Sequence, residues 1–246
     1  MKHLTEPGKR CSLSSVNLEH KYPVLSPEVL FILELEQDEY FPFLAQEEVL
    51  PVVRQAMQKG QLAAHRWGNG TSFKDMVNLL LKQGLTVRFK EKHGENPFTR
   101  AEYDRKKGLI SIYRQSVRQI RQLFREMKLS VPDEDLFLLH LVHEWFHHLE
   151  ETKAGRTDIA LPRVTVRKKG PFAIRKPLKR LREIAAHSFT QTALKLDWSP
   201  LLLDYLLLYK SKGWNTGQIR EAFKKEKERI RSAYASQQTD GEDSAT

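Results

Sequence analysis

Residues 138–151 read Leu-Leu-His-Leu-Val-His-Glu-Trp-Phe-His-His-Leu-Glu-Glu, and this stretch decides how the chain is interpreted. At about 100° of rotation per residue, a helix through it gathers the apolar side chains on one arc. The opposite arc carries imidazoles and carboxylates: His140, His143, Glu144, His147, Glu150 and Glu151, with His148 at its edge. An ordinary solvated helix face carries a mixture of Lys, Arg, Gln and Glu instead. The pattern therefore predicts an amphipathic helix whose polar face has a specific chemical role.

The centre of the stretch has the pattern His-Glu-x-x-His, formed by His143, Glu144 and His147. Histidines four residues apart project from one helix face, so both rings can reach one Zn²⁺ ion at about 2.0–2.1 Å. Zinc lowers the pKa of a bound water to about 7, and Glu144 stands beside the first ligand to accept its proton. The pattern favours a metal site, and solvated or structural histidines are the competing interpretation. Two histidines and a carboxylate also suit iron or manganese.

A catalytic zinc site needs a third protein ligand from another part of the chain. Cys11 is the only cysteine, and we expect it to lie in a loose N-terminal arm, which excludes it. Residues 181–190 offer Glu183 and His187, again four residues apart and so on one face of a helix. We favour Glu183 as the third ligand. His187, one turn further on, would steady an oxyanion or act as an alternate ligand.

Each of these two residues has a simpler interpretation. Glu183 lies beside Arg180 and Arg182, so a surface ion pair would account for it without a metal. His187 is as compatible with an ordinary packed histidine as with a functional one. Ala185 and Ala186 lie between the two candidates, and their small side chains allow another helix to approach closely.

His143-Glu144-Trp-Phe-His147, a long loop and then Glu183 on an Ala-rich helix resemble the gluzincin branch of zinc metallopeptidases. The closer likeness is to the ImmA/IrrE type of bacterial proteins, whose order of elements residues 45–195 follow. Besides the two site helices, the likeness rests on Gly68-Asn-Gly-Thr-Ser-Phe-Lys-Asp, Leu85-Thr-Val-Arg-Phe and Gly108-Leu-Ile-Ser-Ile-Tyr.

The resemblance implies an α+β, zincin-like fold with a small, mostly antiparallel sheet and helices packed on it. It also implies that His143, His147 and Glu183 hold the zinc ion and that Glu144 is the general base. The chain departs from the family in the later helix. That family often has Glu-x-Glu-Ala-x-x-Phe-Ala there, whereas this chain has Glu183-Ile-Ala-Ala-His-Ser-Phe-Thr and keeps only the first Glu.

Periodicity and helix-boundary residues predict the remaining elements. Helices are expected at residues 46–66, 73–83, 115–128, 177–196, 200–210 and 216–235. A strand is expected at 85–90, and a β-hairpin pairs 99–103 with 109–113 around a turn containing Gly108. Residues 154–176 are expected to form a basic loop with a short strand at 164–166. The domain organisation is then a loose arm (1–26), a single domain (27–235) and a disordered tail (236–246).

Two tyrosines lie on the expected hairpin, Tyr103 and Tyr113. A tyrosine hydroxyl could stabilise the oxyanion of a tetrahedral intermediate, and we select Tyr113 as a candidate catalytic residue on that basis. The alternative for each is an aromatic side chain packed on a helix, because aromatic residues favour strands for packing reasons. A peptide substrate could pair with an exposed edge of this sheet.

The formal net charge is +10, and much of the positive charge precedes Glu183. The basic block comprises Lys168, Lys169, Arg175, Lys176, Lys179, Arg180 and Arg182. A solvated surface is the first interpretation of such a block. The second is a cationic rim that selects acidic substrates or contacts nucleic-acid phosphates, although the sequence contains no recognised nucleic-acid-binding motif.

A single cysteine excludes an internal disulfide and fits a reducing compartment. No apolar run approaches the roughly 18 residues of a membrane span, and the N-terminus lacks the apolar core of a secretory signal. We therefore expect a cytoplasmic protein that does not enter a membrane, although the mature part of a longer precursor would show the same features.

Taken together, the motif and the resemblance predict a bacterial zinc-dependent peptidase that acts on a peptide or protein substrate. The alternative is a regulatory protein that binds metal at a non-catalytic site of the same kind and binds a nucleic acid or a partner protein. Nothing in the sequence assigns an oligomeric state.

Overall fold

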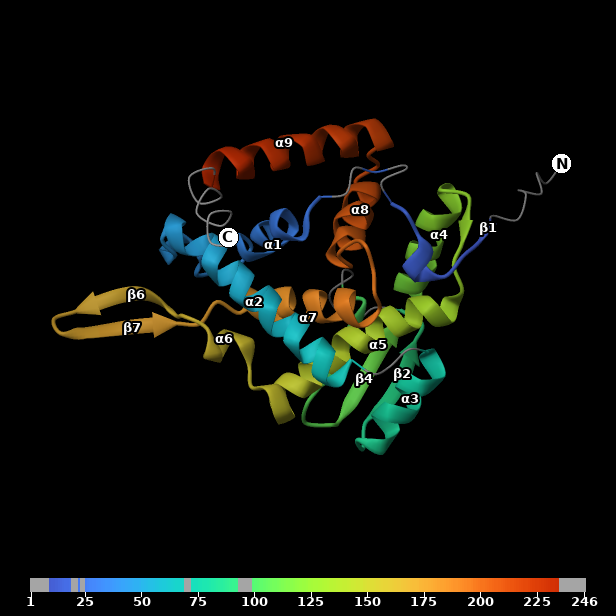
Figure 1. Ribbon diagram of the computed structural model, residues 1–246, viewed down its shortest axis with the longest axis horizontal. Coiled ribbons are helices and arrows are strands. Elements are labelled where there is room, and N and C mark those ends of the chain that lie inside the picture. Colours follow the sequence, from blue (N-terminus) through green and yellow to red (C-terminus); the bar gives the residue numbers. More distant parts are fainter. Residues whose placement is uncertain (1–8, 19–21, 23–24, 69–71, 93–98, 235–246) are drawn as a thin grey trace, which may run out of the picture.

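The computed structural model describes residues 9–18, 22, 25–68, 72–92 and 99–234. It is an α+β structure in which helices dominate (Figure 1). The α-helices are α1 (Pro27–Leu35), α2 (Gln46–Trp67), α3 (Phe73–Lys82), α4 (Arg114–Glu126), α5 (Asp133–Leu149), α6 (Thr157–Ala160), α7 (Arg180–Ala193), α8 (Leu201–Ser211) and α9 (Thr216–Tyr234). Short helical turns are η1 (Leu13–Ser15), η2 (Phe41–Phe43) and the π-helical η3 (Glu150–Ala154). The strands are β1 (Lys9–Arg10), β2 (Thr86–Lys90), β3 (Ala101–Asp104), β4 (Leu109–Tyr113), β5 (Leu129–Ser130), β6 (Val164–Lys169) and β7 (Phe172–Lys176).

The central sheet has three strands in the order β2–β4–β3. The expected hairpin is confirmed: β3 and β4 are antiparallel, with Tyr103 opposite Ile110, and Gly108 has the positive φ that its turn requires. Strand β2 completes the sheet. It runs parallel to β4, with Val87 opposite Ile110, because it pairs with the second strand of the hairpin and not the first. The α+β class and the small sheet are confirmed.

Helix α5 crosses the middle of the molecule, with the sheet on one side and α7 on the other (Figure 1). Its first turn holds Asp133, Glu134 and Asp135, which favour the positive end of the helix dipole. Its apolar arc is buried among side chains of the surrounding helices and the sheet, and Leu141 and Phe146 are fully covered. Burial of this arc fixes which face of α5 turns toward α7, and that face carries the histidines.

Helices α2 and α7 pack unusually close together. A Cβ atom at Gly60 of α2 would lie 2.2 Å from the backbone oxygen of Ala185 in α7, and 2.9 Å from the backbone nitrogen of Phe189. No side chain fits in that space, so glycine is required there. The close approach that Ala185 and Ala186 predicted is confirmed, since both are fully buried at this contact.

The N-terminal segment is not the loose arm that we predicted. Among its described residues, β1 pairs in parallel with β5, and the indole Nε1 of Trp198 donates a hydrogen bond to the backbone oxygen of Val16 at 3.0 Å. Several of its side chains belong to the core: Leu13, Val16, Leu18, Tyr22 and Leu25. The prediction of a loose arm rested on the polar composition of the segment. Its apolar residues are scattered along the sequence but pack together in the core.

The stretch between α5 and α7 is also more regular than we predicted. The short strand expected at residues 164–166 is the start of an antiparallel hairpin, β6–β7, with Gly170 at positive φ in its turn. A short helix, α6, precedes it. The other predicted helices and strands lie within a few residues of the observed ones. The tail that we expected to be disordered, residues 236–246, lies outside the described residues.

None of the described helices is both long enough and apolar enough to cross a membrane.

Candidate metal centre

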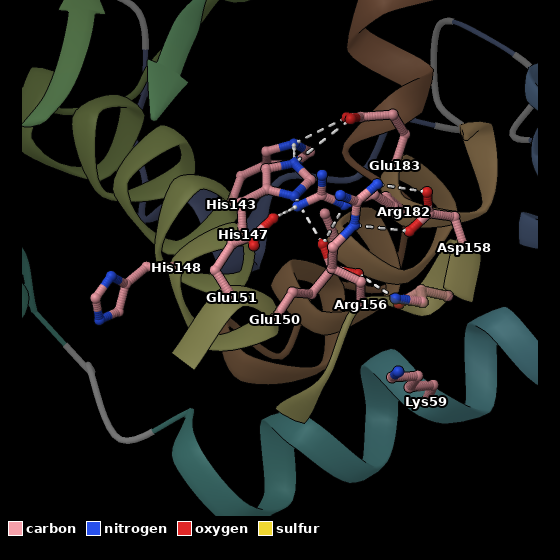
Figure 2. A network of polar contacts seen from close by, with 12 residues as sticks. Lys59, His143, His147, His148, Glu150, Glu151, Arg156, Asp158, Arg182 and Glu183 are labelled. Atoms are coloured by element: carbon pink, nitrogen blue, oxygen red, sulfur yellow. Dashed lines mark hydrogen bonds and ion pairs between the residues drawn. The ribbon is translucent and has the colours of Figure 1, made fainter. Parts of the chain in front are cut away.

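Three donor groups from two helices meet at one point of the structure (Figure 2). His143 and His147 project from α5 one turn apart, and Glu183 projects from the first turn of α7. The Nε2 atoms of the two histidines are 3.3 Å apart. The Glu183 carboxylate lies 3.3 Å from the first of these atoms and 3.5 Å from the second. Among the described residues, no other group of three His, Cys, Asp or Glu side chains brings its donor atoms within 4.8 Å of one another.

The three separations suit a metal ion better than they suit hydrogen bonds. Donors held tetrahedrally by zinc at about 2.0–2.1 Å stand about 3.3–3.4 Å from one another. A hydrogen bond from an imidazole to a carboxylate is usually shorter, about 2.7–2.9 Å. Two imidazoles and one carboxylate form a donor set typical of catalytic zinc sites, which keep a further position for water or substrate.

The alternative interpretation of Glu183 as a surface ion pair is not supported. Arg180 pairs with Glu34 at 2.7 Å, and Arg182 pairs with Glu150 and Glu151 at 2.8 and 3.1 Å. In the part of the chain that the structure describes, the ion-pair partners of Glu183 are the two histidines. The neighbouring arginines therefore leave its carboxylate directed at the donor cluster.

The donor cluster opens into a cavity of about 870 Å³. Glu144 lines this cavity together with His143, His147 and Glu183, although its own side chain is largely buried. Burial raises the pKa of the Glu144 carboxyl, and the charges of His143 and His147 oppose that rise. A carboxylate with a raised pKa, next to a metal donor and open to a cavity, is placed as a general base should be.

Comparisons with protein-family models, with curated proteins and with solved structures found no match to this chain.

His187 lies on the same cavity, as its position four residues after Glu183 predicted. Its ring centroid is 4.7 Å from that of His143, and its Nε2 atom is 3.8 Å from a carboxylate oxygen of Asp204 in α8. It is not part of the three-donor group. Burial, reinforced by the charge of His143, lowers the pKa of His187 to about 3, so its ring is neutral at physiological pH. This placement favours the hydrogen-bonding role over that of an alternate ligand.

His140 has a similar environment, one turn before His143. Burial, together with the charge of Arg100, lowers its pKa to about 3, and it also lines the cavity. Its Nε2 atom and the Nδ1 atom of His187 are buried, and neither has a hydrogen-bond partner among the described residues. Sequence reasoning placed His140 on the polar arc of the helix but gave it no role.

Glu150 is a candidate for orienting His147 that the sequence analysis did not select. Its side chain is fully buried, and its carboxylate accepts a hydrogen bond from His147 Nδ1 at 3.1 Å. Two further donors hold it in place, the backbone N–H of Thr157 at 2.9 Å and Arg182 Nε at 2.8 Å (Figure 2). A carboxylate behind a metal-binding histidine fixes the orientation of its ring and directs the other nitrogen at the ion. The signal was present, because Glu150 lies three residues after His147 on the same polar arc.

His147 and the carboxylates around it shift one another's pKa values. Burial alone would lower the pKa of His147, but the Glu183 and Glu150 carboxylates raise it well above its ordinary value. Burial would raise the pKa of Glu183, but His147 and His143 hold it well below its ordinary value. Without a metal, the site is therefore held together by a protonated His147 between two carboxylates.

The tyrosines and His148 lie apart from the cluster. Tyr113 does not line the cavity, because its hydroxyl points to Glu102 and donates a hydrogen bond to that carboxylate at 2.7 Å. Tyr103 does line the cavity, but its hydroxyl lies 2.9 Å from His148 Nδ1. His148 stacks on Trp145 and points away from Glu183 (Figure 2). A catalytic role for Tyr113 would require its hydroxyl to lie near the donor atoms. The structure places that hydroxyl on Glu102 instead, so it does not support our choice of Tyr113.

Proposed function

We propose that this protein is a zinc-dependent peptidase. The observation that carries the proposal is the meeting of three metal donors, spaced as zinc would hold them, with a buried carboxylate from the same helix on the wall of one cavity. His143, His147 and Glu183 would hold the ion. When bound, zinc supplies a Lewis acid that makes water acidic enough to attack near neutral pH and that polarises a carbonyl oxygen.

The side chains of the protein divide the remaining work. The Glu144 carboxylate takes the proton of the attacking water and passes it to the nitrogen of the leaving amine. His187 stays neutral and keeps one N–H, which we assign to the oxygen of the scissile carbonyl as negative charge develops there. Asp204 lies behind His187 and limits the directions in which its ring can turn.

An extended peptide fits the shape of the site. Strand β3 forms one edge of the central sheet, and Ala101, Glu102 and Tyr103 of this strand line the cavity. A peptide that adds to this edge would form backbone hydrogen bonds with β3 and carry one of its own peptide bonds past the donor cluster. This arrangement supports a peptide or protein substrate over a small molecule.

The experiment that tests this function compares zinc content and hydrolysis in one set of proteins. The wild-type protein is expected to contain one zinc ion per chain and to cleave a fluorescence-quenched peptide library. Glu144→Gln is expected to retain zinc but to lose about 10²–10⁴-fold in rate, because it removes the proton acceptor but no ligand. His143→Ala is expected to lose both the zinc and the activity.

Two outcomes would contradict the proposal. A protein that never takes up zinc excludes the metal centre. A protein that holds zinc but cleaves none of the peptides, or cleaves them equally well as Glu144→Gln, has a metal site with a non-catalytic role.

A further inference from the structure

The hairpin β6–β7 extends away from the body of the molecule (Figure 1). Every residue from Arg167 to Lys176 is exposed, including Phe172 at 76% and Ile174 at 49%. The sequence between Asp158 and Glu183 contains no acidic residue. The result is a protruding two-stranded ribbon that carries positive charge and two large apolar side chains into solvent.

The cations of this ribbon differ from those of the neighbouring helix in their partners. Within the described residues, none of Arg167, Lys168, Lys169, Arg175 and Lys176 forms an ion pair. Arg180 and Arg182 are both paired within the structure, although they belong to the same basic block. The charge of the ribbon is thus available to an external anion, whereas the charge of the two α7 arginines is used internally.

The register of the hairpin distributes these side chains over both faces. Lys169 is opposite Phe172 and Arg167 is opposite Ile174, so these four share one face. The other face carries Lys168, opposite Ala173, and Arg175, opposite Thr165. Lys176 follows Ile174 by two residues and so lies on the first face, which combines three cations with two large apolar side chains. The other face carries cations with small side chains.

We propose that the β6–β7 hairpin binds duplex DNA by entering its major groove. Strand β7 has five residues, all exposed, which at about 3.3 Å per residue gives a ribbon about 17 Å long. The major groove is about 12 Å wide and admits a two-stranded ribbon, with base edges at its floor and phosphates along both walls. Cations on both faces of the ribbon reach both walls, while Phe172 and Ile174 contact the apolar parts of the bases, such as thymine methyl groups.

The same features fit other polyanions less well. The major groove of double-stranded RNA is deep and narrow, so a ribbon with bulky side chains does not enter it. An anionic membrane would contact one face of the ribbon and leave the cations of the other face in water. An acidic peptide paired along one strand would use the cations near that edge and would have no need of an exposed aromatic side chain.

The test measures binding of a fluorescent duplex of about 20 base pairs to the chain of residues 1–246 over a range of salt concentrations. In Arg167→Gln/Lys169→Gln/Arg175→Gln, we expect binding at least about tenfold weaker and a shallower salt dependence, by about 0.9 in slope for each phosphate that the variant no longer neutralises. Arg167→Lys/Arg175→Lys keeps the charge and should bind like the wild type. Phe172→Ser keeps every cation, so it should weaken binding without changing the salt slope.

The matched control removes three cations from α9 instead. Lys224→Gln/Lys227→Gln/Arg231→Gln changes the net charge equally at exposed positions, and we expect it to leave DNA affinity within about twofold of the wild type. An equal loss in the control overturns the proposal, because binding would then follow net charge alone. Equal or tighter binding of duplex RNA, of poly-glutamate or of vesicles containing anionic lipid overturns the assignment to DNA. The proposal does not depend on the metal centre, so Glu144→Gln should bind DNA as the wild type does.

Discussion

Arg182 and Arg175 lie seven positions apart in one basic stretch, yet they have opposite environments. Arg182 bridges Glu150 and Glu151 beneath the metal donors, and its side chain is 22% exposed. Arg175 lies on the outer hairpin, exposed and without an ion-pair partner among the described residues. The sequence presents them as one block of charge, and the fold divides that block in two. The arginine near the donor cluster forms ion pairs within the protein. The arginine on the hairpin can form an ion pair with another molecule.

The largest expected effect on stability comes from breaking the paired set. Arg182→Ala leaves the fully buried Glu150 carboxylate without its arginine partner, and we expect the free energy of unfolding to fall by about 3 kcal/mol. Arg175→Ala should change it by less than about 0.5 kcal/mol, since surface substitutions rarely do more. Urea unfolding of the three proteins measures the difference. If both substitutions lowered the free energy of unfolding equally, the ion pairs of Arg182 would not distinguish it from the exposed Arg175.

The second prediction concerns the residue behind His147. Glu150→Gln weakens the acceptor that orients this ring, and we expect zinc affinity to fall about 10–100-fold, the usual effect of losing such a partner. Glu151→Gln is the control, because Glu151 also pairs with Arg182 but is not the acceptor of the His147 hydrogen bond. Competition with a chromophoric chelator measures both affinities. An unchanged affinity in Glu150→Gln would show that packing alone orients His147.

The third prediction is a pH dependence of the stabilisation by zinc. In the zinc-free protein the pKa of His147 is raised, so the stability that its charge contributes is present below about pH 6.5 and is lost as pH rises through the folded-state value. Zinc requires the neutral ring, so a proton must leave before the ion binds. The free energy by which zinc stabilises the fold should therefore grow between about pH 6 and pH 8, by up to about 1.4 kcal/mol per pH unit, and the gain in melting temperature on adding zinc should grow with it.

Calorimetry or dye-monitored melting with and without a chelator gives this difference at each pH. His143→Ala serves as the control, since loss of a ligand should abolish the gain at every pH. A gain that stays constant over the range would show that His147 is already neutral in the zinc-free protein.

Much of the site could be predicted from the sequence because it depends on local geometry. Two histidines four residues apart must project from one helix face, and an amphipathic helix can bury only its apolar arc. Glu183 was found by a weaker signal, a carboxylate on a later helix, and the structure brings it to the histidines. Glu150 was missed although it lies on the same polar arc, because the hydrogen bonds from Thr157 and Arg182 that hold its carboxylate against His147 come from later segments of the chain.

The errors arose where contacts between distant segments decide the outcome. Scattered apolar residues such as Leu13 and Val16 are too few to form a periodic pattern, and only the finished core shows where they pack. Strand β2 was correctly predicted, but its parallel pairing with β4 depends on which hairpin strand is available at the edge. Tyr113 was chosen for its position on the hairpin, and the hydrogen bond to Glu102 that holds its hydroxyl could not be foreseen.

Gly60 lies on a helix that carries none of the three donor residues, yet it decides how closely α2 and α7 can pack. The absence of a single methyl group at this position lets α2 and α7 touch backbone to backbone. Any larger residue would force α2 and α7 apart at Ala185, two residues after Glu183 in the same helix. The placement of the helix that carries Glu183 thus depends on a glycine more than a hundred residues earlier in the chain.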